Sequence, residues 1–190
     1  MIEYQDGIIA HCYPLDAKCV GYRNWLTVHW DQKKPKRIVM ILMNPSKADA
    51  EESDTTVNRA VSYILANSSS YKEYGGIEVL NISPLYLTDS RELYKQENVF
   101  PKSNRDAIVE RLYKNHSSIV ILGYGNPPKR LAKEYAEEIS WLKSILNGKK
   151  TYRVGEPLVN RHPRHPRGWG YKSLEMKKKY NLQSYLCDSV

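Results

Sequence analysis

The chain has 190 residues, 41% of them hydrophobic and 26% charged, and its formal net charge is +8. This composition is typical of a soluble globular protein that is large enough to bury a core. No apolar run is long enough for a membrane-spanning helix, so we expect no membrane as a partner. We therefore expect one domain over residues 1–190, without an N-terminal secretory signal.

The three cysteines, Cys12, Cys19 and Cys187, are odd in number and lack the paired spacing of a metal site. Reduced thiols in a cytoplasmic protein are the simplest interpretation. No histidine or cysteine pair has zinc spacing, and no phosphate-binding loop or nucleophile elbow is present. We expect no metal and no cofactor.

The first expected elements are two strands. Residues 1–18 show no clear period, but residues 20–30 are rich in β-formers that roughly alternate, which predicts an antiparallel edge strand. Residues 38–43 are six consecutive apolar residues, a pattern typical of a strand buried on both faces of a sheet. The run ends at Asn44-Pro45-Ser46, because proline lacks an amide donor and restricts the residue before it. Asn44 should therefore lie at the carboxyl end of a central strand.

A helix and a second strand follow. After an acidic loop, Ser53 or Asp54 can cap a helix whose apolar residues repeat over 57–65. Gly75-Gly76 predicts a turn. Residues 77–82 then form the next expected strand, which also ends in asparagine and proline, at Asn81 and Pro84.

The remaining pattern repeats this alternation. Ser103 and Asp106 resemble a capping pair for a helix that ends near Asn115. Residues 118–122 predict a short buried strand, and Pro127-Pro128 opens a helix that Asn147-Gly148 closes. Residues 151–154 predict a last strand, and residues 171–190 a C-terminal tail that is helical or acts as a lid.

Strands that alternate with helices predict a three-layer α/β/α fold with a mostly parallel central sheet of four to five strands. Right-handed crossovers place every carboxyl end at the same edge, where ligands bind in open α/β sheets. The residues that this edge would gather are Asn44, Pro45, Ser46, Asn81, Gly123, Tyr124, Gly125, Arg161, His162, Arg164, His165 and Arg167.

Each of these residues also has a purely structural interpretation. Asn44 and Asn81 cap turns well, and Gly123 and Gly125 are common turn residues. Two histidines among three arginines are less easily explained as core residues. The acidic loop from Asp49 to Asp54 could hold a divalent cation, although an exposed helix start favoured by the helix dipole is the simpler interpretation.

Basic residues concentrate near the C-terminus. Residues 161–179 contain seven lysines and arginines against Glu175 alone. Such a cluster attracts phosphate groups, and the chain's 15 tyrosines and four tryptophans offer flat surfaces for bases. We expect a nucleic acid or a nucleotide as the partner.

The motifs taken together resemble a known family. They are Met43-Asn44-Pro45-Ser46-x-Ala48-Asp49, Asp54-x-Thr56, Leu80-Asn81, Gly123-Tyr124-Gly125 and His162-Pro163-x-His165-Pro166. This pattern resembles a bacterial and phage family, domain of unknown function number 1643, over roughly residues 20–168. That family has no established activity.

A more distant resemblance is to the uracil-DNA glycosylase superfamily. Its members have an Asp-Pro or Asn-Pro loop, a Leu-Asn pair, a Trp-Gly or similar pair and a final His-Pro loop, in this order. In some members a Gly-aromatic-aromatic-Gly stretch follows the His-Pro loop. The corresponding pieces here are Asn44-Pro45, Leu80-Asn81, Tyr124-Gly125, His162 to Pro166 and Gly168-Trp169-Gly170.

The resemblance implies a glycosylase-like fold and a metal-independent N-glycosidic hydrolase. Asn44 would position the attacking water and Asn81 would read the base edge. His162 or His165 would donate to a base carbonyl as negative charge develops. Tyr86 or Tyr124 would stack on the base, and the arginines would hold phosphates of a flipped-out nucleotide.

Three alternatives to this hydrolase stay open. The same pocket could serve a nucleic-acid-binding module without catalysis, whose binding would survive Asn44→Ala. It could also serve an enzyme that acts on a small nucleotide or another anionic metabolite. A metal-dependent nuclease would use the acidic loop instead.

Overall fold

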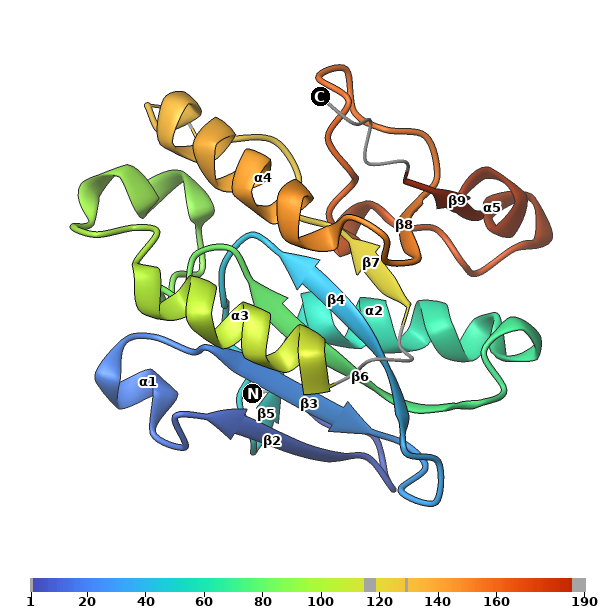
Figure 1. Cartoon of the computed structure of the whole chain (residues 1–190). Coiled ribbons are helices and arrows are strands. Elements are labelled where there is room, and N and C mark those ends of the chain that lie inside the picture. The colour runs from blue at the N-terminus through green and yellow to red at the C-terminus, as the bar shows by residue number, and fades with distance from the viewer. Residues whose placement is uncertain (1, 115–118, 129, 186–190) are drawn as a thin grey trace.

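The computed structural model describes residues 2–114, 119–128 and 130–185. Its centre is a mixed seven-stranded sheet with the strand order β2-β3-β6-β4-β7-β8-β9 (Figure 1). In chain order these strands are β2 (Ile9–Tyr13), β3 (Trp25–His29), β4 (Lys36–Leu42), β6 (Tyr74–Asn81), β7 (Val120–Leu122), β8 (Thr151–Val154) and β9 (Leu182–Ser184). A small separate sheet pairs β1 (Ile2–Glu3) with β5 (Glu52–Ser53).

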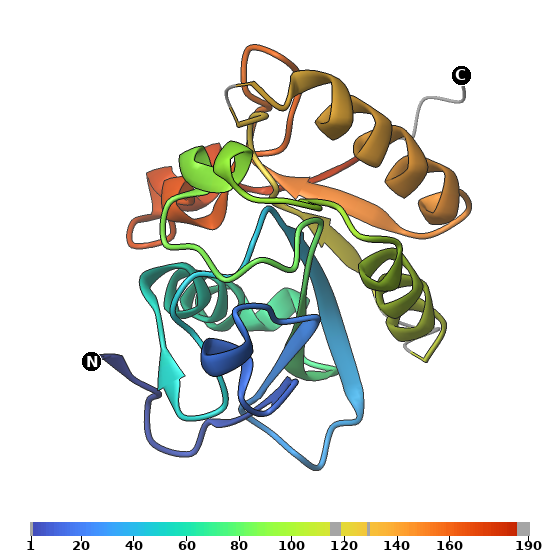
Figure 2. The ribbon, with the colours of Figure 1, turned by 90° about the vertical axis from the view of Figure 1, so that its left-hand side faces the viewer.

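Helices cover both faces of the sheet. They are α1 (Ala17–Val20), α2 (Thr55–Ala66), α3 (Lys102–Lys114), α4 (Ala132–Leu146) and α5 (Leu174–Lys179), with short 3-10 turns η1 (Ser68–Ser70), η2 (Ser90–Lys95) and η3 (Pro166–Gly168). Figure 2 shows α2 on one side of the sheet and α3 and α4 on the other. The expected three-layer α/β/α architecture is confirmed.

Strand β4 contributes to the hydrophobic cores on both faces. Ile38 and Met40 pack in the core that includes α2, while Val39 and Ile41 pack in the core beneath α3 and α4. Successive side chains of a strand point to opposite faces, so an unbroken apolar run is what two covered faces require. This explains the apolar run that predicted the strand.

The centre of the sheet is parallel, as expected. Strand β4 pairs in parallel with β6 and β7, and β7 pairs in parallel with β8. The carboxyl ends of these four strands therefore lie along one edge of the sheet. This edge carries the loops that follow Leu42, Asn81, Leu122 and Val154.

The expected strand count and the expected edge strand are wrong. Strand β3 pairs antiparallel with β6 but is not the edge, because β2 pairs antiparallel on its outer side. Strand β2 alternates exposed and buried positions, but Ile9 and Tyr13 are apolar residues at exposed positions, so the alternation cannot be seen in the sequence. At the other edge, α5 confirms the helical alternative for the C-terminal segment over Leu174–Lys179, but β9, which pairs antiparallel with β8, was not expected. Residues 186–190, with Cys187, lie outside the described residues.

The turn expected at Gly75-Gly76 is also wrong, because both glycines lie inside β6. A Cβ atom on Gly75 would stand 2.1 Å from the Asp31 carbonyl oxygen, and one on Gly76 would stand 2.5 Å from the Val28 carbonyl oxygen. The glycines therefore permit a close approach of the chain that leaves β3.

Other boundaries differ by a few residues. Helix α3 begins at Lys102, so Ser103 lies inside it rather than capping it, and α4 begins at Ala132 rather than at Pro127-Pro128. Ser118, the first residue of the strand expected over 118–122, lies outside the described residues. Within the described ranges, no helix is both long enough and apolar enough to cross a membrane.

Candidate functional site

A cavity of about 210 Å³ lies at the carboxyl ends of β4 and β7. Six of the predicted residues line it, namely Asn44, Ser46, Tyr124, Gly125, His165 and Arg167. They come from three segments that are far apart in the sequence and meet at this edge of the sheet. The other lining residues are Met43, Thr56, Leu87, Thr88, Ser90 and Asn126.

The side chain of Asn44 anchors the loop that contains Leu87, which also lines the cavity. Its Nδ2 donates to the carbonyl oxygens of Leu87, at 2.6 Å, and Pro45, at 2.8 Å. Two carbonyl acceptors on the same side determine which amide atom is nitrogen. The orientation leaves Oδ1 as the acceptor that Asn44 can offer to a ligand or a water.

A second set of bonds holds the loop that carries Asn44 and Ser46. Asp54 caps α2 by accepting from the Val57 N–H, at 2.8 Å, and its other oxygen accepts from the N–H groups of Lys47 and Ala48. The carbonyl oxygen of Ala48 accepts from the buried Arg23 guanidinium and from Tyr86 Oη, the latter at 2.8 Å. The prediction that Asp54 can cap this helix is confirmed.

Two predicted residues therefore lie behind the cavity rather than on its wall. Asn81 is fully buried, and its Oδ1 accepts from the Arg23 guanidinium at 3.1 Å. Tyr86 uses its hydroxyl to hold Ala48 and does not line the cavity. Neither residue is placed to touch a ligand there, and Pro45 is also buried outside the lining.

The Gly123-Tyr124-Gly125 segment follows β7 and contacts the loop of His162 to Pro166. A Cβ on Gly123 would stand 2.9 Å from Leu42 and 3.2 Å from Pro166, so Gly123 serves packing and does not line the cavity. Gly125 donates its N–H to the carbonyl oxygen of Pro163 at 3.1 Å. Tyr124 and Gly125 are thereby held against the loop that supplies His165.

His165 is the N-cap of η3, with Pro166 at the first position of that turn. Its Nδ1 accepts from the Arg167 backbone N–H at 3.4 Å. Burial, with the nearby Arg167 charge, lowers the pKa of His165 to about 4, although Asp54 opposes this shift. At neutral pH the ring is uncharged, and because Nδ1 accepts, the proton lies on Nε2. His165 therefore offers an N–H donor at the cavity.

The other predicted residues of this loop lie elsewhere. The His162 ring packs edge-on against Tyr124 and Tyr135, with centroids 6.1 and 5.4 Å away, and burial lowers its pKa. Arg164 Nε donates to the Glu156 carbonyl oxygen at 2.7 Å, and Arg161 is exposed in a left-handed conformation with φ of 60°. Among the three arginines of the loop, Arg167 alone lines the cavity.

The depressed pKa of His165 predicts a pH-dependent stability. The unfolded state binds a proton on this ring near pH 6.5, and the folded state does so near pH 4. The stabilising effect of the neutral ring is complete above pH 6.5 and is lost as the pH falls toward 4, an effect of about 3 kcal/mol. Urea unfolding at pH 7 and pH 4 should show a larger loss for the wild type than for His165→Gln. If the wild type and His165→Gln lose the same unfolding free energy between pH 7 and pH 4, the pH dependence does not come from His165.

Sequence reasoning missed half of the lining residues. Thr56 stands in the Asp54-x-Thr56 motif, which was the available signal, and Asn126 directly follows Gly125. Leu87, Thr88 and Ser90 carry no sequence signal, because Leu87 and Thr88 belong to an irregular loop that Asn44 holds in place and Ser90 begins the short turn η2 that follows it. The cavity is thus richer in hydroxyl groups than the motifs indicate.

The acidic loop has a structural explanation. Lys18 Nζ pairs with Asp49, at 2.7 Å, and with Glu52, at 2.8 Å. Asp49 also accepts from the backbone N–H groups of Glu51 and Glu52. In the described part of the chain, no group of three or more His, Cys, Asp or Glu side chains is arranged to hold a metal ion.

Comparison with known proteins gave one finding. A family model described as "Protein of unknown function (DUF1643)" matches residues 23–167, which include Arg23 and all twelve residues that line the cavity. No curated protein and no solved structure matches the chain.

Proposed function

We infer that this chain, which belongs to the DUF1643 family, hydrolyses the N-glycosidic bond of a nucleotide, either free or within a nucleic acid. One observation carries the proposal. An oriented acceptor, Asn44 Oδ1, and an uncharged donor, His165 Nε2–H, belong to side chains that line the same small cavity. The order of the motifs, which is similar to that of the uracil-DNA glycosylase superfamily, supports the same reaction.

In this reaction Asn44 acts on the attacking water and His165 acts on the departing base. The bond between the sugar C1′ and the base nitrogen breaks, its electron pair goes to the base, and a water oxygen forms the new bond to C1′. The proton that this water loses passes to the departing base, which leaves as the neutral base. Asn44 Oδ1 orients that water but cannot take its proton, so bond breaking must run ahead of attack. Negative charge then develops on the departing base, where His165 Nε2–H and Arg167 stabilise it.

The dimensions of the cavity support a single-nucleotide site. Pockets that bind drug-sized ligands span about 300–1,000 Å³, whereas this cavity holds about 210 Å³. It has room for one base or sugar ring and none for a duplex. A nucleotide of duplex DNA would have to flip out of the stack to enter it.

A second candidate is a nucleotide-binding module without catalysis. The observation that favours it is the absence of a carboxylate from the described lining of the cavity. Two carboxylates lie beside the lining, but Asp54 accepts backbone N–H groups on both of its oxygens, and Asp89, between Thr88 and Ser90, pairs with Arg91. Such a module would bind the same ligand and release it unchanged.

The test is a substrate panel with an Asn44→Ala variant. Purified protein is incubated with mononucleotides and with single- and double-stranded oligonucleotides that carry uracil, mismatches and modified bases. We expect a free base and an abasic sugar from at least one substrate, and a large loss of turnover in Asn44→Ala with nearly unchanged affinity. Asn67→Ala is the matched control, because Asn67 Nδ2 also holds a backbone carbonyl, that of Tyr63, but lies outside the cavity.

The outcomes separate the candidates. Ligand binding without base release, equal in the wild type and Asn44→Ala, identifies the binding module. Absence of both binding and release over the whole panel contradicts both candidates. Thermal unfolding of each variant shows whether a loss of turnover follows from loss of the fold.

A further inference from the structure

A second and larger cavity, of about 640 Å³, lies on the opposite side of the loop that Asn44 anchors. Pro84 and Leu85 line this cavity, while Leu87 and Thr88 line the candidate site. We call this second cavity the aromatic groove. The side chains that give its walls their character are Tyr13, Tyr22, Trp25, Glu97, Asp106 and Glu110.

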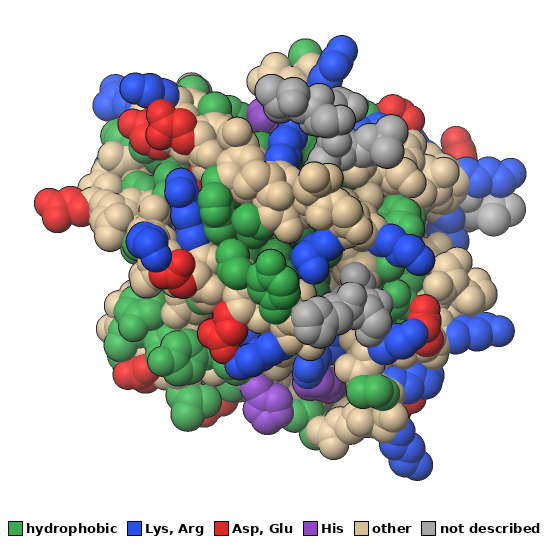
Figure 3. Space-filling view, in the orientation of Figure 1, with side chains coloured by type: hydrophobic (Ala, Val, Ile, Leu, Met, Phe, Trp, Pro, Cys, Tyr) green, Lys and Arg blue, Asp and Glu red, His purple; other side chains and the backbone are tan. Residues whose placement is uncertain are grey.

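One wall of the aromatic groove is apolar and exposed. Tyr13 is 56% exposed and Tyr22 is 40% exposed, and the segment between them adds Leu15 at 80% and Val20 at 42%. Figure 3 shows hydrophobic side chains gathered at the lower left, over α1 and the adjoining ends of β2 and β3. A gathering of large exposed apolar residues beside a cavity is typical of a protein–protein contact surface.

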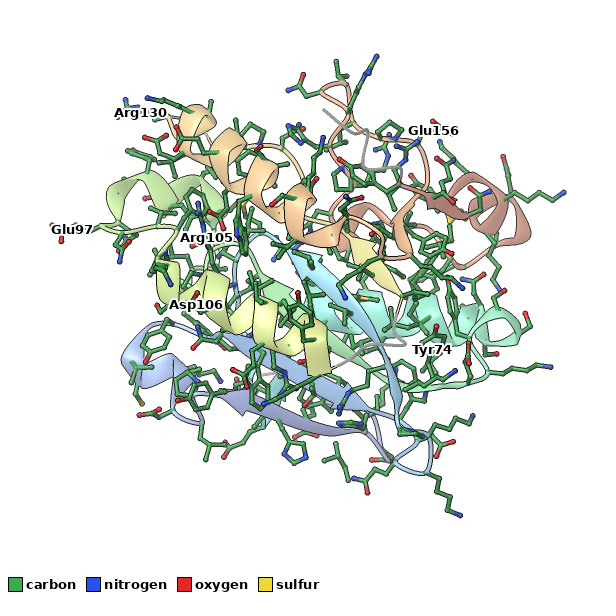
Figure 4. The ribbon with its side chains drawn as sticks, viewed as in Figure 1. Tyr74, Glu97, Arg105, Asp106, Arg130 and Glu156 are labelled. Carbon is green, nitrogen blue, oxygen red and sulfur yellow. The ribbon has the colours of Figure 1, made fainter. Side chains whose placement is uncertain are left out.

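The opposite wall is acidic. Glu97, Asp106 and Glu110 all line the groove and are exposed. Figure 4 shows Glu97 projecting from the loop after η2 and Asp106 on α3. Lysines one turn away pair with Asp106 and Glu110, but exposed pairs of this kind contribute at most about 1 kcal/mol and exchange easily. An acidic surface is unexpected on a chain whose net charge is +8.

One cation of the chain, the Arg111 guanidinium, already packs on the aromatic wall of the groove. The guanidinium carbon of Arg111 stands 4.4 Å from the centroid of the Trp25 ring, and Tyr13 stacks beside Trp25 with ring centroids 6.0 Å apart. Arg111 also pairs with the buried Glu78, which balances its charge. Exposed tyrosine rings next to carboxylates provide the same contact for a cation from outside the chain.

We propose that the aromatic groove binds an extended peptide segment of a partner protein, one that carries a lysine or arginine next to apolar residues. The apolar side chains of the segment cover Tyr13 and Tyr22, and its cation lies between their rings and the carboxylates of Glu97 and Glu110. Charge complementarity selects a peptide over a nucleic acid, because a phosphate backbone would be repelled by this wall.

Selection from a random peptide library tests the proposal, because it does not require the partner protein to be identified. A phage-displayed library of random heptapeptides is selected on the immobilised full-length protein. We expect enrichment of sequences with a lysine or arginine beside apolar residues. A synthetic, fluorescently labelled peptide of the enriched sequence should bind with a Kd that rises at least about tenfold in the double variant Glu97→Lys/Glu110→Lys.

The matched control is Asp6→Lys/Glu175→Lys, which changes the net charge by the same amount at exposed positions outside the groove. This control should bind the peptide as the wild type does. Lack of enrichment, enriched sequences without a basic residue, or equal binding by the groove variant would overturn the proposal. Sedimentation that shows a dimer of the wild type, absent in the groove variant, would also overturn it and identify a second copy of the chain as the occupant.

Discussion

Replacing His165 with asparagine is expected to lower the turnover number for base release about 10²–10³-fold, the usual cost of losing one donor to a developing negative charge. The asparagine Oδ1 takes the place of the imidazole Nδ1, so it can still accept from the Arg167 N–H and cap η3. It has no atom at the place of Nε2. The variant therefore removes the proposed donor and keeps the turn, and steady-state kinetics on the best substrate of the panel measure the loss.

Two further variants make this result specific. In His165→Gln the amide nitrogen reaches the place of Nε2, so this variant should recover part of the lost turnover. His162→Asn removes the neighbouring histidine, which packs against Tyr124 and Tyr135 outside the cavity, and should change turnover less than about tenfold. If His162→Asn proves as damaging as His165→Asn, the assignment of the donor to His165 is wrong.

The largest expected effect on stability belongs to Asp54→Ala. Asp54 is 5% exposed as a residue, and its carboxylate accepts from three backbone N–H groups, of Val57, Lys47 and Ala48. Loss of the helix cap costs about 1 kcal/mol, and the Ala48 amide, which is buried, adds about 1–3 kcal/mol when it loses its acceptor. We expect the free energy of unfolding to fall by about 3 kcal/mol, as measured by urea denaturation at pH 7.

The matched control for this prediction is Asp89→Ala. Asp89 is also an N-cap, that of η2, and accepts from the Arg91 N–H at 2.9 Å, but its side chain is 41% exposed. Water can replace the lost acceptor there, so the expected loss is below about 1 kcal/mol. Similar losses at Asp54 and Asp89 would show that the loop carrying Asn44 does not depend on Asp54.

These bonds give the Asp54-x-Thr56 motif a physical explanation. Asp54 joins the start of α2 to the loop after β4, and Thr56, in the first turn of the same helix, reaches the wall of the cavity. The buried Arg23 guanidinium donates to the Ala48 carbonyl oxygen of the same loop and to Asn81 Oδ1, so it joins this loop to the end of β6. The Leu80-Asn81 motif therefore supports the site from the core rather than from the cavity wall.

The sequence by itself determined the features that depend on local pattern. The apolar run over 38–43 predicted β4, because a strand buried on both faces is apolar at every position. The helical spacing over 57–65 predicted α2, because a helix buried on one face repeats its apolar residues with the helical period. The alternation of strands and helices predicted a parallel centre and, with it, the edge of the sheet where Asn44, Tyr124 and His165 meet.

Only the tertiary structure decided which partner each polar group meets. His162 and His165 are equivalent in the sequence, yet packing against two tyrosines directs one ring away and leaves the other at the cavity. Asn81 ends β6 and Asn44 lies just beyond the end of β4, but the buried Arg23 donates to Asn81 and not to Asn44. Such choices depend on side chains that are distant in the chain and close in space, so no local period records them.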